Sequence, residues 1–250
     1  MKNYVKKILP MHMGKIGFKF RKEFLKVYAY LIYTEDGSIY LFDTGLNPLF
    51  YSDKEKIMEN LTHFIKIDVE EKHLLGNKLR KLGIEKENLK AVILSHLHFD
   101  HSGGISEFQE TDVPVIVQKR ECEIAKDLAK GRAFEYKAAD IEGLDKKINL
   151  VMFEGDSLVD DNKAIKCLIT HGHSAGHQSL LLEGRNKSML LTGDAVYTRE
   201  ELDSGRMSAI PFRRGEALDS IERVQKLAKH CDYVICGHDR DVYIGHAITL

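Results

Sequence analysis

Short apolar runs recur along this chain, and each is soon followed by glycine or by a carboxylate or imidazole side chain. Their length and β-branched content are typical of buried strands. The four clearest runs are Ala91–Leu94, Ile165–Thr170, Ser188–Leu191 and Tyr233–Cys236. Two more β-rich runs, Val27–Thr34 and Ser38–Asp43, flank residues 35–37, whose sequence EDG predicts a hairpin turn.

Apolar residues at helical spacing predict three helices, over Leu74–Leu82, Glu121–Lys130 and Glu216–His230. The segment Leu46–Gly76 is mixed, polar and rich in lysine and glutamate, which indicates helices and loops beside a site rather than a separate domain. The strands come in two batches with helices between them, as in α/β proteins. We therefore expect residues 1–250 to form a single α/β domain.

A cluster of potential metal ligands follows the first of the four runs. Within six positions directly after that predicted strand lie His96, His98, Asp100 and His101. Four strongly hydrated groups at one strand tip would be costly to bury if they served packing alone. Imidazole and carboxylate groups bind zinc-like divalent ions, so the hexapeptide predicts a metal site.

The other three runs lead to residues of the same chemical type. A glycine lies beside each of these groups: His171 and His173, then Asp194, then His238 and Asp239. Proteins of the α/β class assemble their sites at the carboxyl ends of strands. The convergence of four segments therefore supports a metal centre more strongly than the hexapeptide alone.

The composition fits a protein with a substantial core and no strong overall field. The chain has 250 residues, 43% of them hydrophobic, and a formal net charge of −1. A nearly balanced charge provides no global attraction to nucleic acid or to an anionic membrane, although small basic patches remain open. We expect no nucleic acid and no membrane among the partners.

The cysteines show neither a CxxC pair nor a disulfide framework, so we expect reduced and mostly buried thiols at Cys122, Cys167, Cys231 and Cys236. Cys236 stands in a predicted strand beside a ligand segment, where a core role is favoured over a ligand role. The amino-terminal segment lacks the apolar stretch of a signal peptide, and no run reaches the length of a membrane helix. These features predict a cytoplasmic protein.

The ligand motifs resemble those of the metallo-β-lactamase superfamily. They are HLHFDH at 96–101, GH at 172–173, GD at 193–194 and GH at 237–238. The resemblance begins with LFDTG at 41–45 and keeps the superfamily's order. Within the superfamily, SHLHFDH, GHQSL at 176–180 and DAVYT at 194–198 are similar to motifs of the N-acyl-homoserine lactonases. The resemblance implies an α/β fold, the αβ/βα sandwich of the metallo-β-lactamase type.

The resemblance also implies a dinuclear metal centre with seven protein ligands. The first ion would be held by His96, His98 and His173, the second by Asp100, His101 and His238, and both would share Asp194. Two divalent ions are expected, zinc first, with iron, manganese and cobalt left open. A bridging water whose pKa is lowered by the ions would supply hydroxide as the nucleophile.

By the same resemblance, the substrate partner is a small acyl lactone. The hydroxide would open the lactone ring of an N-acyl-homoserine lactone and so degrade a quorum signal. The expected catalytic residues are Asp100 and Tyr197, and Tyr197 in DAVYT matches a lactonase tyrosine that acts near the substrate carbonyl. An ordinary packing role is the alternative for Tyr197. Relatives often form dimers, so a homodimer stays open.

Residues near the motifs keep two interpretations. Phe99 either packs beneath the site or binds substrate by lining a pocket for an acyl chain, together with an early loop around Met11 and Met13. Asp43 serves either a turn or a hydrogen bond to a ligand residue. The same two roles are open for Asp239, and for this residue the structural role in a turn is favoured.

The remaining histidines call for restraint. His171 stands where family members commonly carry proline, and His177 is expected to fix a loop by hydrogen bonding. The histidines outside the constellation are expected on the surface or in the core: His12, His63, His73, His230 and His246.

Other functions share this scaffold. A thioester hydrolase of the glyoxalase II kind would use nearly the same ligands but gives Tyr197 no role. Phosphodiesterases and nucleases need a basic phosphate-binding surface. β-Lactam-cleaving enzymes are commonly exported, and the diiron electron-transfer proteins typically carry glutamate in place of His98. The alternative function is therefore a thioester hydrolase, or another esterase or phosphodiesterase of this fold.

Overall fold

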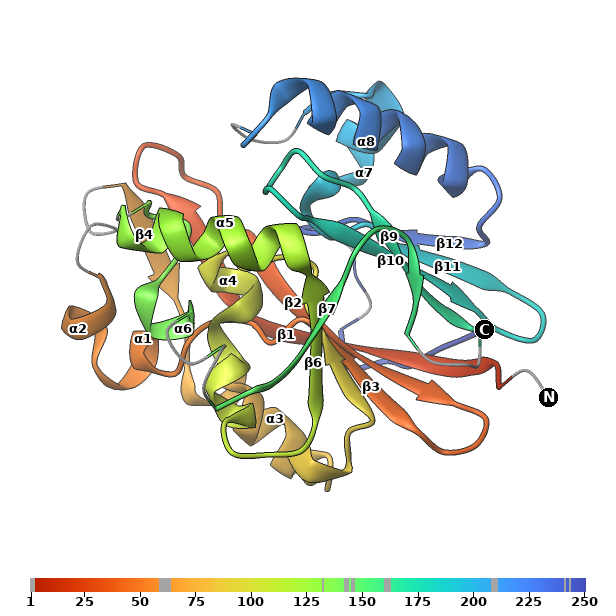
Figure 1. Ribbon diagram of the computed structural model, residues 1–250, viewed down its shortest axis with the longest axis horizontal. Helices are drawn as coiled ribbons and strands as arrows, with labels where there is room; N and C mark the ends of the chain where they lie inside the picture. Colours follow the sequence, from red (N-terminus) through yellow and green to blue (C-terminus); the bar gives the residue numbers. More distant parts are fainter. Residues whose placement is uncertain are drawn as a thin grey trace.

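Two β-sheets face each other, and helices cover the outer surface of each sheet (Figure 1). The computed structural model describes residues 3–58, 64–131, 133–141, 144, 147–159, 163–207, 211–240, 242 and 244–250. The arrangement of helix, sheet, sheet and helix confirms the expected αβ/βα sandwich.

The first sheet has eight strands among the described residues, in the order β13-β1-β2-β3-β5-β6-β7, with β4 paired to β1. Their bounds are β1 (Val5–Phe18), β2 (Leu25–Thr34), β3 (Ile39–Phe42), β4 (Ile65–Asp68), β5 (Ala91–Ile93), β6 (Pro114–Gln118), β7 (Asn149–Phe153) and β13 (Ile248–Thr249). The pairs from β3 to β7 are parallel, whereas the pairs that involve β1 or β2 are antiparallel.

The second sheet has the order β12-β11-β10-β9-β8. Its strands are β8 (Ser157–Leu158), β9 (Ile165–Ile169), β10 (Gln178–Glu183), β11 (Ser188–Leu191) and β12 (Tyr233–Ile235). Only the pair of β11 with β12 is parallel in this described sheet. Parallel pairing places the carboxyl ends of β11 and β12 side by side, where Asp194 and His238 follow.

The helices form the outer layers. Their bounds are α1 (Leu49–Ser52), α2 (Lys54–Met58), α3 (Leu75–Lys81), α4 (Phe99–Ser102), α5 (Lys119–Lys130), α6 (Ala138–Ile141), α7 (Arg199–Ser204) and α8 (Arg214–Ala228). Short 3-10 turns are η2 (Glu71–His73), η3 (Lys86–Asn88), η4 (Gly103–Phe108) and η5 (Gly193–Ala195). The three predicted helices and six predicted strands agree with the structure within two residues at each end.

Alternating side chains of the inner strands build the core on both faces of each sheet. In β3, Tyr40 and Phe42 point between the two sheets, while Leu41 points toward the helices of the first layer. In the second sheet, Leu190 of β11 points to the outer face and packs against Val224 of α8. Because these strands are buried on both faces, their sequences read as continuous apolar runs rather than alternating ones.

Two sequence-based expectations were wrong. Residues around Met11 and Met13 form the middle of β1 rather than a loop, and both side chains lie in the core beneath the helices. Segment 46–76 contains a strand, β4, in addition to helices and turns. Ile65 and Ile67 alternate with polar residues there, which is the strand signal that the overall polarity of the segment obscured.

The cysteines are free thiols, and only Cys231 is partly exposed, as predicted. Cys236 is a core residue of the layer beneath α7 and α8. Within the described ranges, no helix combines the length and apolarity needed to cross a bilayer.

A buried carboxyl group in α6 leads to a prediction for stability. Asp140 Oδ1 accepts a hydrogen bond of 2.6 Å from Asn47 Nδ2, while Oδ2 has no partner in the described part of the chain. Burial raises the pKa of Asp140 to about 7. Between pH of about 4 and 7 the unfolded chain gives up this proton before the folded chain does, so stability falls as the pH rises.

Asp140→Asn keeps an oxygen for Asn47 and removes the buried charge. The free energy of unfolding should rise by about 1–3 kcal/mol at a pH of about 8 and change little at a pH of about 4. Denaturant titrations at the two pH values measure this difference, with Asp112→Asn, an exposed position, as control. An equal effect at both pH values would contradict the assignment.

Candidate metal centre

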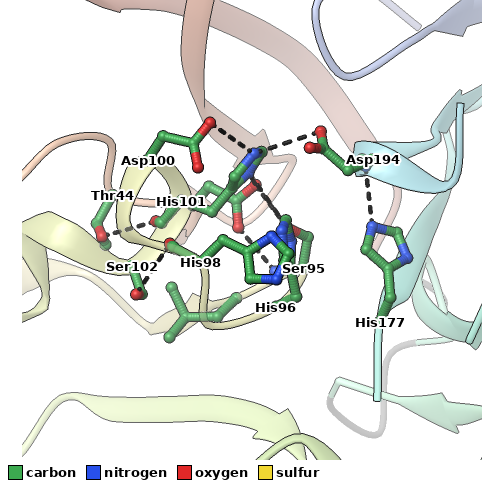
Figure 2. Close-up of polar contacts among 12 residues, drawn as sticks. Thr44, Ser95, His96, His98, Asp100, His101, Ser102, His177 and Asp194 are labelled. Atoms are coloured by element: carbon green, nitrogen blue, oxygen red, sulfur yellow. Dashed lines mark hydrogen bonds and ion pairs between the residues drawn. The ribbon is translucent and has the colours of Figure 1, made fainter. Parts of the chain in front are cut away.

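All seven predicted ligands meet at one edge of the sandwich, where β5, β9, β11 and β12 end. They form three overlapping groups whose ligand atoms lie within 4.8 Å of one another: His96, His98 and His173; His96, His101 and Asp194; Asp100, His101 and His238. The first and third groups are the two triads that the sequence resemblance implied. Figure 2 shows five of the seven, with His101 between Asp100 and Asp194.

Asp194 lies at the centre of the cluster. Its Oδ2 is 3.4 Å from His173 Nε2 and 3.2 Å from His238 Nε2. Its Oδ1 is 3.3 Å from His101 Nε2. Asp194 therefore contacts members of both triads, which is the position that a shared ligand requires.

The donor set fits divalent metal ions. His96 Nε2, His101 Nε2 and Asp194 Oδ1 are buried, and in the described part of the chain they have no well-formed hydrogen bond beyond the 3.3 Å ion-pair contact between the last two. Unsatisfied buried polar atoms are rare and costly. Since these atoms converge from the ends of two strands, β5 and β11, a cation with nitrogen and oxygen ligands is the natural partner for them.

The two triads differ in electrostatics. Burial, aided by neighbouring imidazoles, lowers the pKa values of His96 and His98 well below their ordinary range and that of His173 to about 4. These three rings are therefore neutral near pH 7 and keep a lone pair free for a metal ion.

The triad of Asp100, His101 and His238, together with the shared Asp194, contains carboxylates beside its imidazoles. Burial works against charge on Asp194, but the nearby His238 and His101 outweigh it and hold the pKa of Asp194 well below its usual range. Burial also works against charge on His101, yet the carboxylates of Asp194 and Asp100 raise its pKa. Burial raises the pKa of Asp100 itself. This half of the site combines imidazole with carboxylate oxygen.

Hydrogen bonds fix the orientation of the ligand rings. His101 Nδ1 donates to Asp43 Oδ2 at 2.9 Å, and His238 Nδ1 donates to the Lys26 carbonyl at 2.7 Å. His96 Nδ1 lies 2.9 Å from Ser95 Oγ. With Nδ1 engaged, each ring turns Nε2 toward the cluster, as is usual for metal-binding histidines.

Asp43 and His177 tie the ligand segments to the two sheets. Asp43 adopts φ of 60° at the end of β3 and also accepts from the Ser95 backbone at 2.7 Å, so both of its proposed roles hold. His177 accepts from the Asp194 backbone N–H at 2.9 Å (Figure 2), and it pairs with Thr170 Oγ1 at 2.8 Å. The predicted loop-fixing role of His177 is confirmed.

Two glycines permit the close approach of the ligand segments. A Cβ atom at Gly237 would collide with Asp194 Oδ1, so a larger residue would push β12 away from the cluster. Gly172 has φ of 119° and lies directly against the Ala217 backbone of α8. Only glycine adopts that conformation at low cost.

Glu121 is the functional neighbour that the sequence analysis missed. It is fully buried at the start of α5, where Oε1 accepts from Leu97 N at 3.0 Å and Tyr136 Oη at 3.2 Å. Oε2 accepts from Ser174 Oγ at 2.8 Å and Gly176 N at 2.6 Å. The one signal in the sequence was a glutamate on the apolar side of a helix, next to a buried cysteine.

The two proposed substrate residues have different surroundings. The partly exposed Tyr197 ring packs edge-on against His238 at 4.7 Å and against His173 at 5.7 Å between ring centroids. Phe99 is 4% exposed and packs against Phe50 at 5.7 Å, which corresponds to the packing alternative.

The other singled-out residues have structural contacts. His171 pairs with Arg120 at 3.0 Å, and Asp239 accepts the Arg199 backbone N–H at 2.7 Å. His12 and His73 pack edge to face at 4.7 Å, away from the cluster. His230 and His246 are exposed, and His63 lies outside the described residues.

The sandwich and the buried His/Asp cluster together define a metal-binding protein of the α/β class. The model of the metallo-beta-lactamase superfamily matches residues 23–238, so the chain belongs to that superfamily. An N-acyl homoserine lactonase of a Bacillus sp. is 36% identical over 224 residues, or 86% of this chain and 82% of that protein. The N-acyl homoserine lactonase AiiA of Bacillus thuringiensis subsp. kurstaki is 36% identical over 222 residues, with the same coverage.

A solved structure is similar over almost the whole chain. It is an N-acyl homoserine lactone hydrolase with the product N-hexanoyl-L-homoserine bound at its catalytic metal center. The TM-score is 0.81 at 31% identity, over 95% of both chains.

The contacts of Glu121 predict that it controls metal affinity. Glu121→Gln leaves one oxygen and one amide group, so one of the backbone N–H groups of Leu97 and Gly176 must face another donor. The loops carrying His98 and His173 should then shift apart, and metal affinity should fall about 10- to 100-fold. Competition with a chelator, followed by metal analysis, measures this loss.

Glu123→Gln, at an exposed position of the same helix, serves as the matched control. Circular dichroism should show both variants folded. Unchanged chelator competition in a folded Glu121→Gln protein would remove the residue from metal binding.

Proposed function

We propose that this protein is a metal-dependent hydrolase that opens the lactone ring of N-acyl homoserine lactones to give N-acyl homoserines. The observation that carries the proposal is the position of Tyr197 against the His/Asp cluster, in a chain that matches N-acyl homoserine lactonases over most of its length. Hydrolysis of such a signal by a cell silences quorum communication.

The proposed ligand set follows the two triads. One divalent ion is held by His96, His98 and His173, a second by Asp100, His101 and His238, and Asp194 is common to both. Bound there, divalent ions supply Lewis acidity for a substrate carbonyl and make water a better nucleophile near neutral pH. We propose zinc as the ion, because five of the seven proposed ligands are imidazoles, which suit it.

Tyr197 is proposed to donate a hydrogen bond to the substrate. Burial and the neighbouring carboxylate of Asp194 raise its pKa well above the ordinary value, so the phenol keeps its proton. The ring packs against His173 and His238, and its hydroxyl hydrogen-bonds to Asp194, so the phenol lies directly beside the cluster. A hydrogen bond to the lactone carbonyl or ring oxygen becomes stronger as negative charge develops there.

Asp100 is proposed to move a proton. Its Oδ2 lies 3.5 Å from His101 Nε2 and 3.8 Å from His238 Nε2, inside the cluster. When the ring C–O bond breaks, the departing oxygen needs a proton, and a buried carboxyl group beside the reacting atoms is suited to deliver it.

The free, mostly buried cysteines fit a reducing compartment, so we propose a cytoplasmic location.

The function is tested by a pH-sensitive hydrolysis assay on the purified, metal-analysed protein. The substrates are short- and long-chain acyl homoserine lactones, a glutathione thioester and a phosphodiester. We expect lactone opening to be the fastest reaction, with about two metal ions per chain. Faster turnover of the thioester or the phosphodiester would keep the metal centre and reject the lactonase function.

The substitution Tyr197→Phe removes only the hydroxyl group and so tests its contribution to the reaction. Loss of one hydrogen bond to developing charge should lower kcat for lactone opening by about 10- to 1,000-fold, with metal content unchanged. Tyr233→Phe removes a hydroxyl that accepts from Lys187 far from the cluster, and should leave kcat unchanged. A Tyr197→Phe enzyme with wild-type kcat would show that the ring only packs.

A further inference from the structure

The end of the β1–β2 hairpin is an exposed aromatic surface that the proposed chemistry does not use. Phe20 is 73% exposed and Phe64, just before β4, is 59% exposed. Phe18 stacks on Phe20 at 5.2 Å, and the Lys19 backbone N–H donates to the Phe64 carbonyl at 2.8 Å. We call Phe18, Phe20, Phe24 and Phe64 the aromatic tip, which lies at the end of the molecule opposite the two termini (Figure 1).

The aromatic tip exposes rings on both faces of the hairpin. Phe18 pairs with Ile65 across β1 and β4, so these two side chains share a face, and Phe20 stacks on it. Lys66 follows Ile65 in β4 and therefore points to the opposite face. Phe24 lies on that opposite face too, 4.3 Å beneath the Lys66 ammonium. A second protein surface would cover one face, whereas a lipid headgroup layer surrounds both.

Basic side chains surround the aromatic tip. Residues 19–24 read KFRKEF and are all exposed, and Lys66 adds a fourth positive charge beside Lys19, Arg21 and Lys22. Glu23 is the one acid of this hexapeptide, and it forms an ion pair of 2.8 Å with Arg240. Aromatic rings among lysines and arginines are typical of protein segments that bind the interface of anionic membranes.

We propose that the aromatic tip docks the protein on the surface of an anionic lipid bilayer. The rings enter the headgroup region end-on, while the basic side chains contact acidic headgroups. This departs from the sequence-based expectation of no membrane partner, which rested on the charge of the whole chain. A net charge of −1 leaves room for a local cluster of opposite sign.

Docking would also serve the reaction, a step that rests on the proposed function. Phe18 packs against the apolar cluster that contains Ile65, Phe50 and Phe99, and Phe99 follows the proposed ligand His98. The aromatic tip is therefore continuous with apolar packing that reaches the ligand segment. Long-chain acyl lactones partition into bilayers, so a docked enzyme meets them at higher local concentration.

Vesicle flotation tests the docking without any lactone. The metal-loaded protein is mixed with phosphatidylcholine vesicles that contain about 30% phosphatidylglycerol, or none, at about 0.15 M salt. We expect co-flotation with the anionic vesicles and at least tenfold weaker partition to the neutral ones. Equal partition to both vesicle types, or none to either, overturns the proposal.

Variants locate the contact. Phe20→Ser with Phe64→Ser should lower the partition coefficient by about tenfold for each ring removed. Arg21→Gln with Lys22→Gln should lower it about fivefold per charge. Leu218→Ser, at a 44% exposed position of α8, is the control and should bind like the wild type. Wild-type binding by both double variants overturns the assignment to this hairpin.

Two further measurements separate the alternatives. If the aromatic tip instead joins two copies of this chain, light scattering will show a dimer that the Phe20→Ser, Phe64→Ser variant loses, and vesicles will not bind. Turnover of a short-chain lactone in vesicle-free buffer should be unchanged in that variant. If the wild type does not hydrolyse lactones at all, the proposed function is rejected, and the vesicle experiment alone still decides the docking proposal.

Discussion

Seven imidazole and carboxylate side chains share one largely buried volume, and much of the molecule is arranged to keep them there. Five of them are at most 4% exposed: His96, Asp100, His101, Asp194 and His238. Buried polar groups of this kind destabilise a fold unless each finds a partner. The cluster therefore requires both a surrounding layer of hydrogen bonds and positive charge at its centre, which divalent ions supply.

That surrounding layer comes from parts of the fold far from the ligands in sequence. Asp43 reaches His101 from the end of β3, and His177 holds the Asp194 backbone from the start of β10. Glu121 joins the loop of Leu97 to the loop of Gly176 from α5. Since these anchors come from both sheets and a helix, the packing of the sandwich sets the relative positions of the ligands.

The surroundings of the cluster match a substrate with a polar head and an apolar tail. Tyr197 and His173 are partly exposed, whereas the side toward Asp43 is closed by hydrogen bonds. Next to the ligand segment, Phe99 and its neighbours form apolar packing that continues through Phe18 to the hairpin end. The polar His/Asp cluster and the apolar packing around Phe99 and Phe18 are thus separate but adjoining parts of the structure.

The cluster of seven imidazole and carboxylate side chains was predictable from sequence because each follows a short apolar run, and both the run and the polar residue after it are local features. The helices α3, α5 and α8 were predictable for the same reason, as were the strands β2, β3, β5, β9, β11 and β12. By contrast, Pro10 and Gly14 made β1 look irregular, and only pairing with β2, β4 and β13 makes it a strand, with a register shift between His12 and Gly14. The role of Glu121 likewise depended on tertiary structure, because its partners Leu97 and Gly176 lie 24 and 55 residues away, and hydrogen bonds over such separations leave no local pattern.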